Sequence, residues 1–155
     1  MKEVKFNDLT LQIHKINDLI NENIQIVINS NAFIKGNFVK QFEDNFKKYS
    51  NVKHAIGVSN GTDALLIAME SLKSKGEVLV QPTTYVASAS MIPRIGNEVK
   101  FIDVDKDSWQ ISLDNVSDKF SKEVVGIIGV HLYGFAFDVE NLSLIHISEP
   151  TRPLY

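Results

Sequence analysis

The sequence predicts an α/β fold, an incomplete three-layer sandwich around a mostly parallel sheet. Short apolar segments alternate along the chain with longer segments whose apolar residues recur every three or four positions, which is the alternation of strands and helices. Several of the short segments are apolar on both faces, as are parallel strands covered by helices on both sides. With 155 residues, of which 44% are hydrophobic, the chain is long enough to form a core.

The N-terminal part predicts two helices. Between Asp8 and Ser30, isoleucines and valines recur at steps of three and four, so we expect an amphipathic helix with Asp8 as its N-cap. A second helix is predicted after Gly36, where aromatic residues recur at helical spacing. These residues are Phe38, Phe42, Phe46 and Tyr49. An aromatic stripe of this kind usually belongs to a core.

The pattern then changes to units of strand, turn and helix. His54–Val58 is short and apolar and predicts a strand, Ser59–Gly61 predicts a turn, and a helix is expected to carry Leu65 to Leu72. Further strands are predicted at Val78–Val80, Val99–Val104 and Val124–Val130.

Two helices are expected between these later strands. A helix of small residues is predicted from about Thr84 to Ile92, where Pro93 should end or kink it. Ser112 is expected to cap the next helix, which carries Leu113, Val116 and Phe120.

Composition excludes several classes of function. The formal net charge of −3 provides no basic field for nucleic acid or anionic lipid. Without cysteine, the chain has no disulfide, thiolate nucleophile or cysteine zinc site. No signal-like or membrane-spanning apolar run is present, so we expect a cytoplasmic protein without a membrane partner.

The candidate site lies in the loops that follow the strands, because open α/β sheets bind ligands beyond the carboxyl ends of their strands. Gly61 and Thr62 stand at a predicted helix start, where free amides and the helix dipole favour an anion such as phosphate. Taken alone, an ordinary turn capped by Thr62 or Asp63 is the simpler interpretation. The segment matches neither the P-loop nor the dinucleotide-binding pattern.

Two further residues belong to these loops. Tyr85 could cover a flat cofactor ring, or it could be a core or interface tyrosine with a paired hydroxyl. A lone histidine such as His131 is more often structural than catalytic. His14 and His54 form no metal-ligand spacing with it, so no metal site is expected.

Taken in order, these segments resemble the DegT/DnrJ/EryC1/StrS family of sugar aminotransferases, which are fold-type-I pyridoxal-phosphate enzymes. The resemblance runs from about Phe33 to about Leu142. The matching stretches are GNFVKQFE at 36–43, AIGVSNGTDAL at 55–65, PTTYVAS at 82–88, FIDVD at 101–105 and VHLYG at 130–134. The resemblance implies that the sheet is part of the large domain of a pyridoxal-phosphate-dependent transferase, with pyridoxal 5'-phosphate as cofactor.

Carried over by position, the resemblance implies that Gly61, Thr62 and Asp63 contact the cofactor phosphate and that Tyr85 stacks on its pyridine ring. His131 is expected in the active site without an assigned role. The intact enzyme would move an amino group, usually from glutamate, to a keto group of a nucleotide-linked deoxysugar, and would act as a homodimer.

The groups that would complete this chemistry are absent from the chain. In the family, the lysine that carries the cofactor and the aspartate that keeps its pyridine nitrogen protonated lie downstream of the segment that matches His131–Gly134. No catalytic residue is therefore assigned, and the chain alone is expected to be inactive.

The sequence divides into three predicted segments. Residues 1–32 form an N-terminal helical segment, and residues 33–141 form a partial cofactor-binding large domain. Residues 142–155 are expected to be a non-native tail, because residues 142–152 resemble a translation of the mosaic-end adapter used in transposase-based sequencing libraries.

Other functions stay open. A related sugar dehydratase, in which histidine replaces the lysine, would differ in the missing segment. A non-catalytic α/β module could bind a phosphate-bearing ligand or a partner protein through Gly61 and Thr62. A nicotinamide-dependent enzyme is disfavoured, because no acidic residue follows a glycine-rich turn at the required distance.

Overall fold

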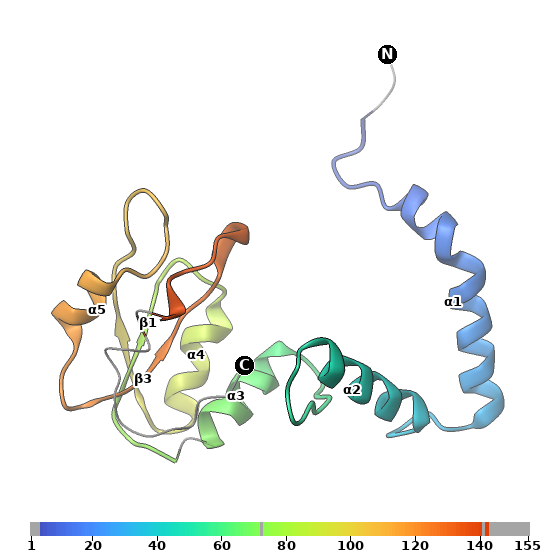
Figure 1. Ribbon diagram of the computed structural model, residues 1–155, viewed down its shortest axis with the longest axis horizontal. Helices are drawn as coiled ribbons and strands as arrows, with labels where there is room; N and C mark the ends of the chain where they lie inside the picture. The colour runs from blue at the N-terminus through green and yellow to red at the C-terminus, as the bar shows by residue number, and fades with distance from the viewer. Residues whose placement is uncertain (1–3, 72, 141, 143–155) are drawn as a thin grey trace. The chain divides into compact units, whose positions relative to one another are not determined.

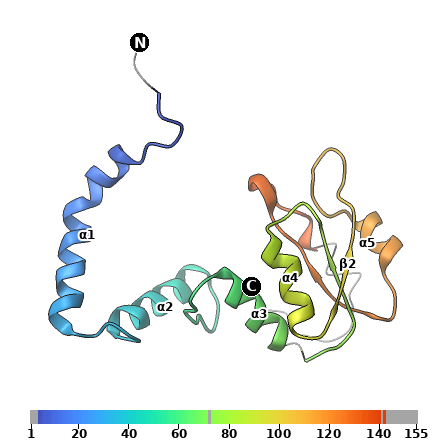
Figure 2. The same cartoon turned by 180° about the vertical axis from the view of Figure 1, so that it is seen from behind.

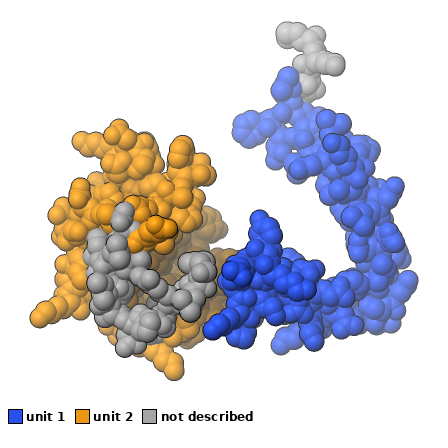
Figure 3. All heavy atoms as spheres, in the orientation of Figure 1, with its two compact units in different colours: residues 1–57, 153–155 blue, residues 58–152 orange. Residues whose placement is uncertain are grey.

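The computed structural model describes residues 4–71, 73–140 and 142. It divides into two compact units, the first ending at Gly57 and the second beginning at Val58 (Figure 3). The segments predicted at residues 1–32, 33–141 and 142–155 refer to the domains of a longer protein, and these boundaries remain predictions. Apart from Leu142, the predicted tail lies outside the described residues.

The first unit contains the two predicted helices, α1 (Thr10–Ser30) and α2 (Asn37–Tyr49) (Figure 1). The prediction of Asp8 as N-cap is wrong by one residue, because Leu9 occupies that position. Asp8 still stabilises the helix start, since its carboxylate accepts hydrogen bonds from the Thr10 amide at 2.9 Å and from the Thr10 hydroxyl. Neither α1 nor α2 has the length and apolarity for a membrane crossing, and the same holds for every other described helix.

The aromatic stripe of α2 is not part of a core, contrary to expectation. Neither α1 nor α2 has a buried residue, and Phe42 is 64% exposed. The Phe42 and Phe46 rings stack on each other, with centroids 5.9 Å apart. Helical spacing predicted the stripe, but a stripe is buried only where another element packs along it, and no described element of this unit does so.

The second unit is an α/β sheet domain. Its elements are α3 (Gly61–Ser71), β1 (Glu77–Val80), α4 (Val86–Arg94), β2 (Glu98–Phe101), α5 (Leu113–Lys119), β3 (Val124–Ile128) and the short 3-10 helix η1 (Leu132–Gly134). The three strands pair in parallel in the order β2-β1-β3. The later strands and helices predicted from the sequence are thereby confirmed, with ends that differ by a few residues.

The sheet is covered on both faces, which confirms the predicted fold class. Val78 and Val80 of β1 pack with Met69 of α3 and with Met91 of α4. Leu79, between them, points to the other face and packs with residues that include Val116 of α5. Figures 1 and 2 show α3 and α4 side by side. The layers are therefore α3 with α4, the sheet, and α5.

The strand predicted at His54–Val58 is wrong. This segment is irregular, and none of the three described strands pairs with it. The Gly57 amide instead donates to the side chain of Glu43, with 2.7 Å between nitrogen and Oε1. Because a strand is stabilised by hydrogen bonds to a neighbouring strand, an apolar segment that pairs with no described strand is not part of the sheet.

Candidate functional site

The carboxyl ends of the three parallel strands meet at one edge of the sheet. β1 leads into residues 81–85, β2 into residues 102–112 and β3 into residues 129–134. Tyr85 and His131 therefore belong to neighbouring loops, as the sequence predicts for a site in an open α/β sheet.

The start of α3 lies near the same edge. Helices α3 and α4 run in the same general direction (Figures 1 and 2), and Met69 and Met91 share one core cluster. At 1.5 Å per residue, Thr62 and Tyr85 each lie roughly 10 Å along their helices from this contact. The starts of α3 and α4 therefore lie at similar distances from this shared core cluster.

The N-cap of α3 is Asn60, which the sequence did not single out. Its side-chain oxygen accepts a hydrogen bond from the Asp63 amide at 2.9 Å, and its backbone carbonyl accepts one from the Ala64 amide at 3.1 Å. The cap role considered for Thr62 or Asp63 is therefore wrong. Asparagine is a favoured N-cap residue, so the sequence did contain a signal for this cap. Several residues that can cap a helix lie close together in this segment, however, and the signal did not single out Asn60.

Capping by Asn60 leaves the first two amides of α3 free. A helix supplies no partner for these amides. Within the described part of the chain, the amides of Gly61 and Thr62 and the Thr62 hydroxyl have no hydrogen-bond partner. A Cβ atom placed on Gly61 would meet no atom within 4 Å, so the space beside the Gly61 backbone is open. This donor set fits an anionic group such as a phosphate.

Asp63 is engaged within the turn. Its amide donates to Asn60, and its carboxylate accepts hydrogen bonds from the Ser59 hydroxyl and, at 3.2 Å, from the Asn60 side-chain amide. In this arrangement neither group of Asp63 is free for a ligand.

The ring of Tyr85 lies at the surface. The residue precedes α4 in an extended conformation, and its carbonyl accepts a hydrogen bond from the Ser88 amide at 2.9 Å. The residue is 73% exposed, so Tyr85 is not a core tyrosine in this chain. A flat apolar face is therefore available to a ligand at this edge.

His131 is fixed by its own loop. Its ring stacks on that of Phe137 with 4.6 Å between centroids, and its Nδ1 accepts a hydrogen bond from the Phe137 amide at 3.3 Å. The carbonyl of the next residue, Leu132, accepts a hydrogen bond from Gln110 Nε2 at 3.1 Å. This glutamine contacts the loop of His131, and the sequence analysis did not single it out.

The loop after β2 lines a hollow of about 680 Å³, whose wall includes Thr83 and Trp109. Asp105 organises the loop: its carboxylate accepts from the Ser108 amide at 2.8 Å and from the Ser108 hydroxyl at 2.9 Å. Both hydrogen bonds favour the ionised form and hold the pKa of Asp105 below its usual range.

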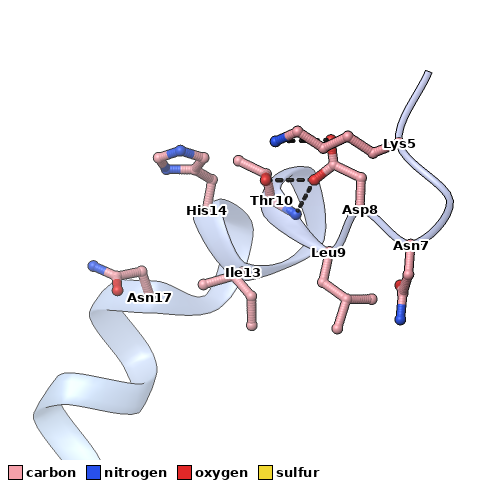
Figure 4. A pocket seen from close by; sticks show the side chains of 8 residues that line it. All are labelled: Lys5, Asn7, Asp8, Leu9, Thr10, Ile13, His14 and Asn17. Atoms are coloured by element: carbon pink, nitrogen blue, oxygen red, sulfur yellow. Dashed lines mark hydrogen bonds and ion pairs between the residues drawn. The ribbon is translucent and has the colours of Figure 1, made fainter. Parts of the chain in front are cut away.

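Another hollow, of about 620 Å³, lies beside the start of α1 in the first unit (Figure 4). Its charged groups are paired among themselves, because Lys5 Nζ lies 3.9 Å from the Asp8 carboxylate. The hydrogen bonds from Thr10 also lower the pKa of Asp8. None of the residues predicted for the site lines this hollow.

The chain matches the model of the DegT/DnrJ/EryC1/StrS aminotransferase family over residues 14–148. It is 38% identical over 110 residues to the GDP-perosamine synthase of Escherichia coli O157:H7, a match that covers 70% of this chain and 30% of that protein. The chain spans 30 to 40% of the length of such curated relatives.

Solved structures share the fold. DesV of S. venezuelae in complex with a ketimine intermediate gives a TM-score of 0.87 at 26% identity, over 94% of this chain and 40% of that chain. A GDP-4-keto-6-deoxymannose-3-dehydratase with a trapped PLP-glutamate geminal diamine gives 0.75 at 28% identity, over 83% of this chain and 35% of that chain. These matches confirm the fold class and the resemblance inferred from the sequence.

Proposed function

Because the chain belongs to the DegT/DnrJ/EryC1/StrS aminotransferase family, we propose that it is part of a pyridoxal-phosphate-dependent sugar aminotransferase whose cofactor phosphate binds at the start of α3. The observation that carries this proposal is the free donor set at Gly61 and Thr62. When bound, the cofactor supplies the electron sink that allows an amino group to move between donor and sugar.

Gly61 and Thr62 would hold the phosphate. Their two amides and the Thr62 hydroxyl are three donors in consecutive residues, and the dipole of α3 adds a favourable field. Since Gly61 carries no side chain, a phosphate can approach the backbone closely. A contact from the Asp63 amide stays a prediction, and it would require the Asn60 side chain to release that amide.

Tyr85 and His131 would form the wall of the same site. The exposed ring of Tyr85 can stack on the pyridine ring of the cofactor, and it stands at the carboxyl edge together with His131. The chain contains no residue to which we assign the cofactor-bearing role, so we expect it to be inactive alone.

The proposed substrates of the intact enzyme are a nucleotide-linked keto-deoxysugar and an amino donor, with glutamate expected. The names of the E. coli relative and of the structurally similar dehydratase both refer to GDP sugars, which supports this substrate class. We further propose that the intact enzyme is a homodimer.

A sugar dehydratase is the second candidate function, because a dehydratase is among the structurally similar enzymes. The downstream coding sequence at the source locus distinguishes the two. A lysine at the cofactor-bearing position supports the aminotransferase, whereas a histidine there supports the dehydratase. A native stop codon shortly after Tyr155 would instead contradict the expectation of a longer parent protein.

The phosphate site can be tested on the 155-residue chain. Titration with pyridoxal phosphate, followed by the phosphorus NMR signal, should show binding that Thr62→Ala weakens by about tenfold, since one charge-assisted hydrogen bond is lost. Tyr85→Ala should weaken binding as well. Thr10→Ala and Tyr49→Ala, in the first unit, are the matched controls. Equal affinity in Thr62→Ala and Thr10→Ala would refute the proposed phosphate site.

Inactivity of the chain is tested separately. Borohydride reduction in the presence of pyridoxal phosphate should leave no single lysine labelled in preference to the others. A stable adduct on one defined lysine would show that the chain carries its own cofactor-bearing residue.

A further inference from the structure

In the segment that follows β3, three groups pack against one another: the backbone of Gly129, the ring of Phe137 and the imidazole of His131. The Phe137 ring lies against Gly129, so closely that a Cβ atom on Gly129 would come within 2.3 Å of the ring. The imidazole of His131 stacks on the same ring. The lack of a side chain at Gly129 therefore allows Phe137 to lie beside His131.

The hydrogen bond within this stack determines the tautomer of His131. A neutral imidazole has one nitrogen that donates and one that accepts. Because Nδ1 accepts the Phe137 amide at 3.3 Å, the proton of neutral His131 is on Nε2. His131 is thus a hydrogen-bond donor through Nε2, and its side chain is exposed at the carboxyl edge of the sheet.

Gln110, in the loop after β2, contacts the loop after β3 that carries His131. The residue is 3% exposed, and its Nε2 donates to the carbonyl of Leu132, directly after His131. The backbone of Gln110 is itself held, since its carbonyl accepts from the Asp105 amide at 2.9 Å and its amide donates to the Ser108 hydroxyl at 3.3 Å. The glutamine is therefore a fixed link between the loop after β2 and the loop after β3.

The oxygen of the Gln110 side-chain amide takes no part in this link. Its Oε1 atom is buried and has no hydrogen-bond partner in the described part of the chain. A buried amide with one unsatisfied oxygen is unfavourable compared with an apolar side chain of similar size. The hydrogen bond to Leu132 is the favourable contact that this side chain makes with the rest of the site.

We infer that Gln110 is a positioning residue, which holds the Leu132 carbonyl so that His131 keeps a fixed Nε2–H donor at the carboxyl edge of the sheet. Such a donor suits an oxygen acceptor of a bound ligand. The ligand-binding role of His131 rests on the proposed function, whereas the tautomer and its dependence on Gln110 do not.

The test uses the complete 155-residue chain, labelled with nitrogen-15 and carbon-13 and without pyridoxal phosphate, at about pH 8. A scalar coupling across the hydrogen bond should join the Phe137 amide nitrogen to His131 Nδ1, and His131→Gln assigns the signal. Gln110→Leu keeps the apolar volume and removes the donor. It should weaken or abolish the coupling and accelerate exchange of the Phe137 amide by about tenfold.

Gln41→Leu, on the exposed surface of α2, is the matched control and should leave both signals unchanged. If Gln110→Leu does not fold, the unsubstituted chain provides the test. One of the two Gln110 side-chain amide protons should exchange more slowly than the other and should couple to the Leu132 carbonyl. A protonated Nδ1 on His131, or an unchanged coupling in folded Gln110→Leu, would overturn the inference. Because no cofactor is present, this outcome is independent of whether the chain binds pyridoxal phosphate.

Discussion

At the scale of single residues, the cap of α3 determines which donors remain for a ligand. Asn60, Thr62 and Asp63 all have side chains suited to an N-cap, so the sequence could not select among them. The structure selects Asn60, and this choice frees Thr62. The sequence therefore predicted that a helix begins here but not which residue caps it, because capping depends on the backbone angles of one residue.

Replacing Asn60 should separate capping from ligand binding. Asn60→Ala removes the acceptor of the Asp63 amide, and we expect it to lower the free energy of unfolding by about 1 kcal/mol. Urea denaturation followed by the fluorescence of Trp109, the single tryptophan, measures this loss in the second unit. Asn60→Asp is the control, since it keeps the cap while adding a negative charge that should weaken phosphate binding. Equal stability of Asn60→Ala and the parent chain would show that the cap contributes nothing.

The Asp105 turn should respond to acid. Its hydrogen bonds lower the folded-state pKa of Asp105, so the stabilisation is complete above the ordinary aspartate pKa of about 3.9 and is lost as pH falls through the lower folded-state value. The Trp109 amide donates to the Asp105 carbonyl at 2.9 Å, so Trp109 emission should report this step with a midpoint below about 3.9. Asp105→Asn should abolish the step, and Asp107→Asn should retain it. A step that survives in Asp105→Asn would assign it to another group.

At the scale of secondary structure elements, the sequence predicted the sheet well and its first strand wrongly. β1 and β3 are apolar on both faces and lie where the pattern places them. His54–Val58 has a similar composition but pairs with none of the described strands. Apolar pattern thus predicts which segments can form strands, whereas pairing depends on segments far away in the chain.

Gly76 is the position where the three strands meet, and it should not tolerate a side chain. Its carbonyl accepts from the Glu98 amide of β2, and a Cβ atom there would lie 2.3 Å from the carbonyl oxygen of Glu123, next to β3. Its φ of 157° adds strain for other residues. Gly76→Ala should therefore lower the free energy of unfolding by at least about 2 kcal/mol in the urea experiment.

Gly126→Ala is the control within the same sheet, because the nearest atoms to a Cβ there lie 4.0 Å away, at ordinary contact distance. We expect a change below about 1 kcal/mol. If both variants were equally stable, the position of Gly76 would have no role in joining the strands.

At the scale of the whole molecule, the two units should differ in local stability. In the second unit Leu79, Val80 and Ile92 are fully buried around the sheet, whereas no residue of α1 or α2 is buried. Helices without tertiary packing are only marginally stable in water. We therefore expect hydrogen exchange, measured by mass spectrometry, to show strong protection in peptides that cover β1 and α4 and rapid exchange in peptides that cover α1 and α2.

Protein concentration provides the control for this prediction. Apolar side chains on α1 and α2 are exposed in the single chain, and association would cover them. Protection of these helices that rises with concentration would indicate association, while protection of β1 should stay constant. Protection of α1 equal to that of β1 at the lowest concentration would contradict the prediction, because a helix with no buried residue would then be as stable as the core of the sheet.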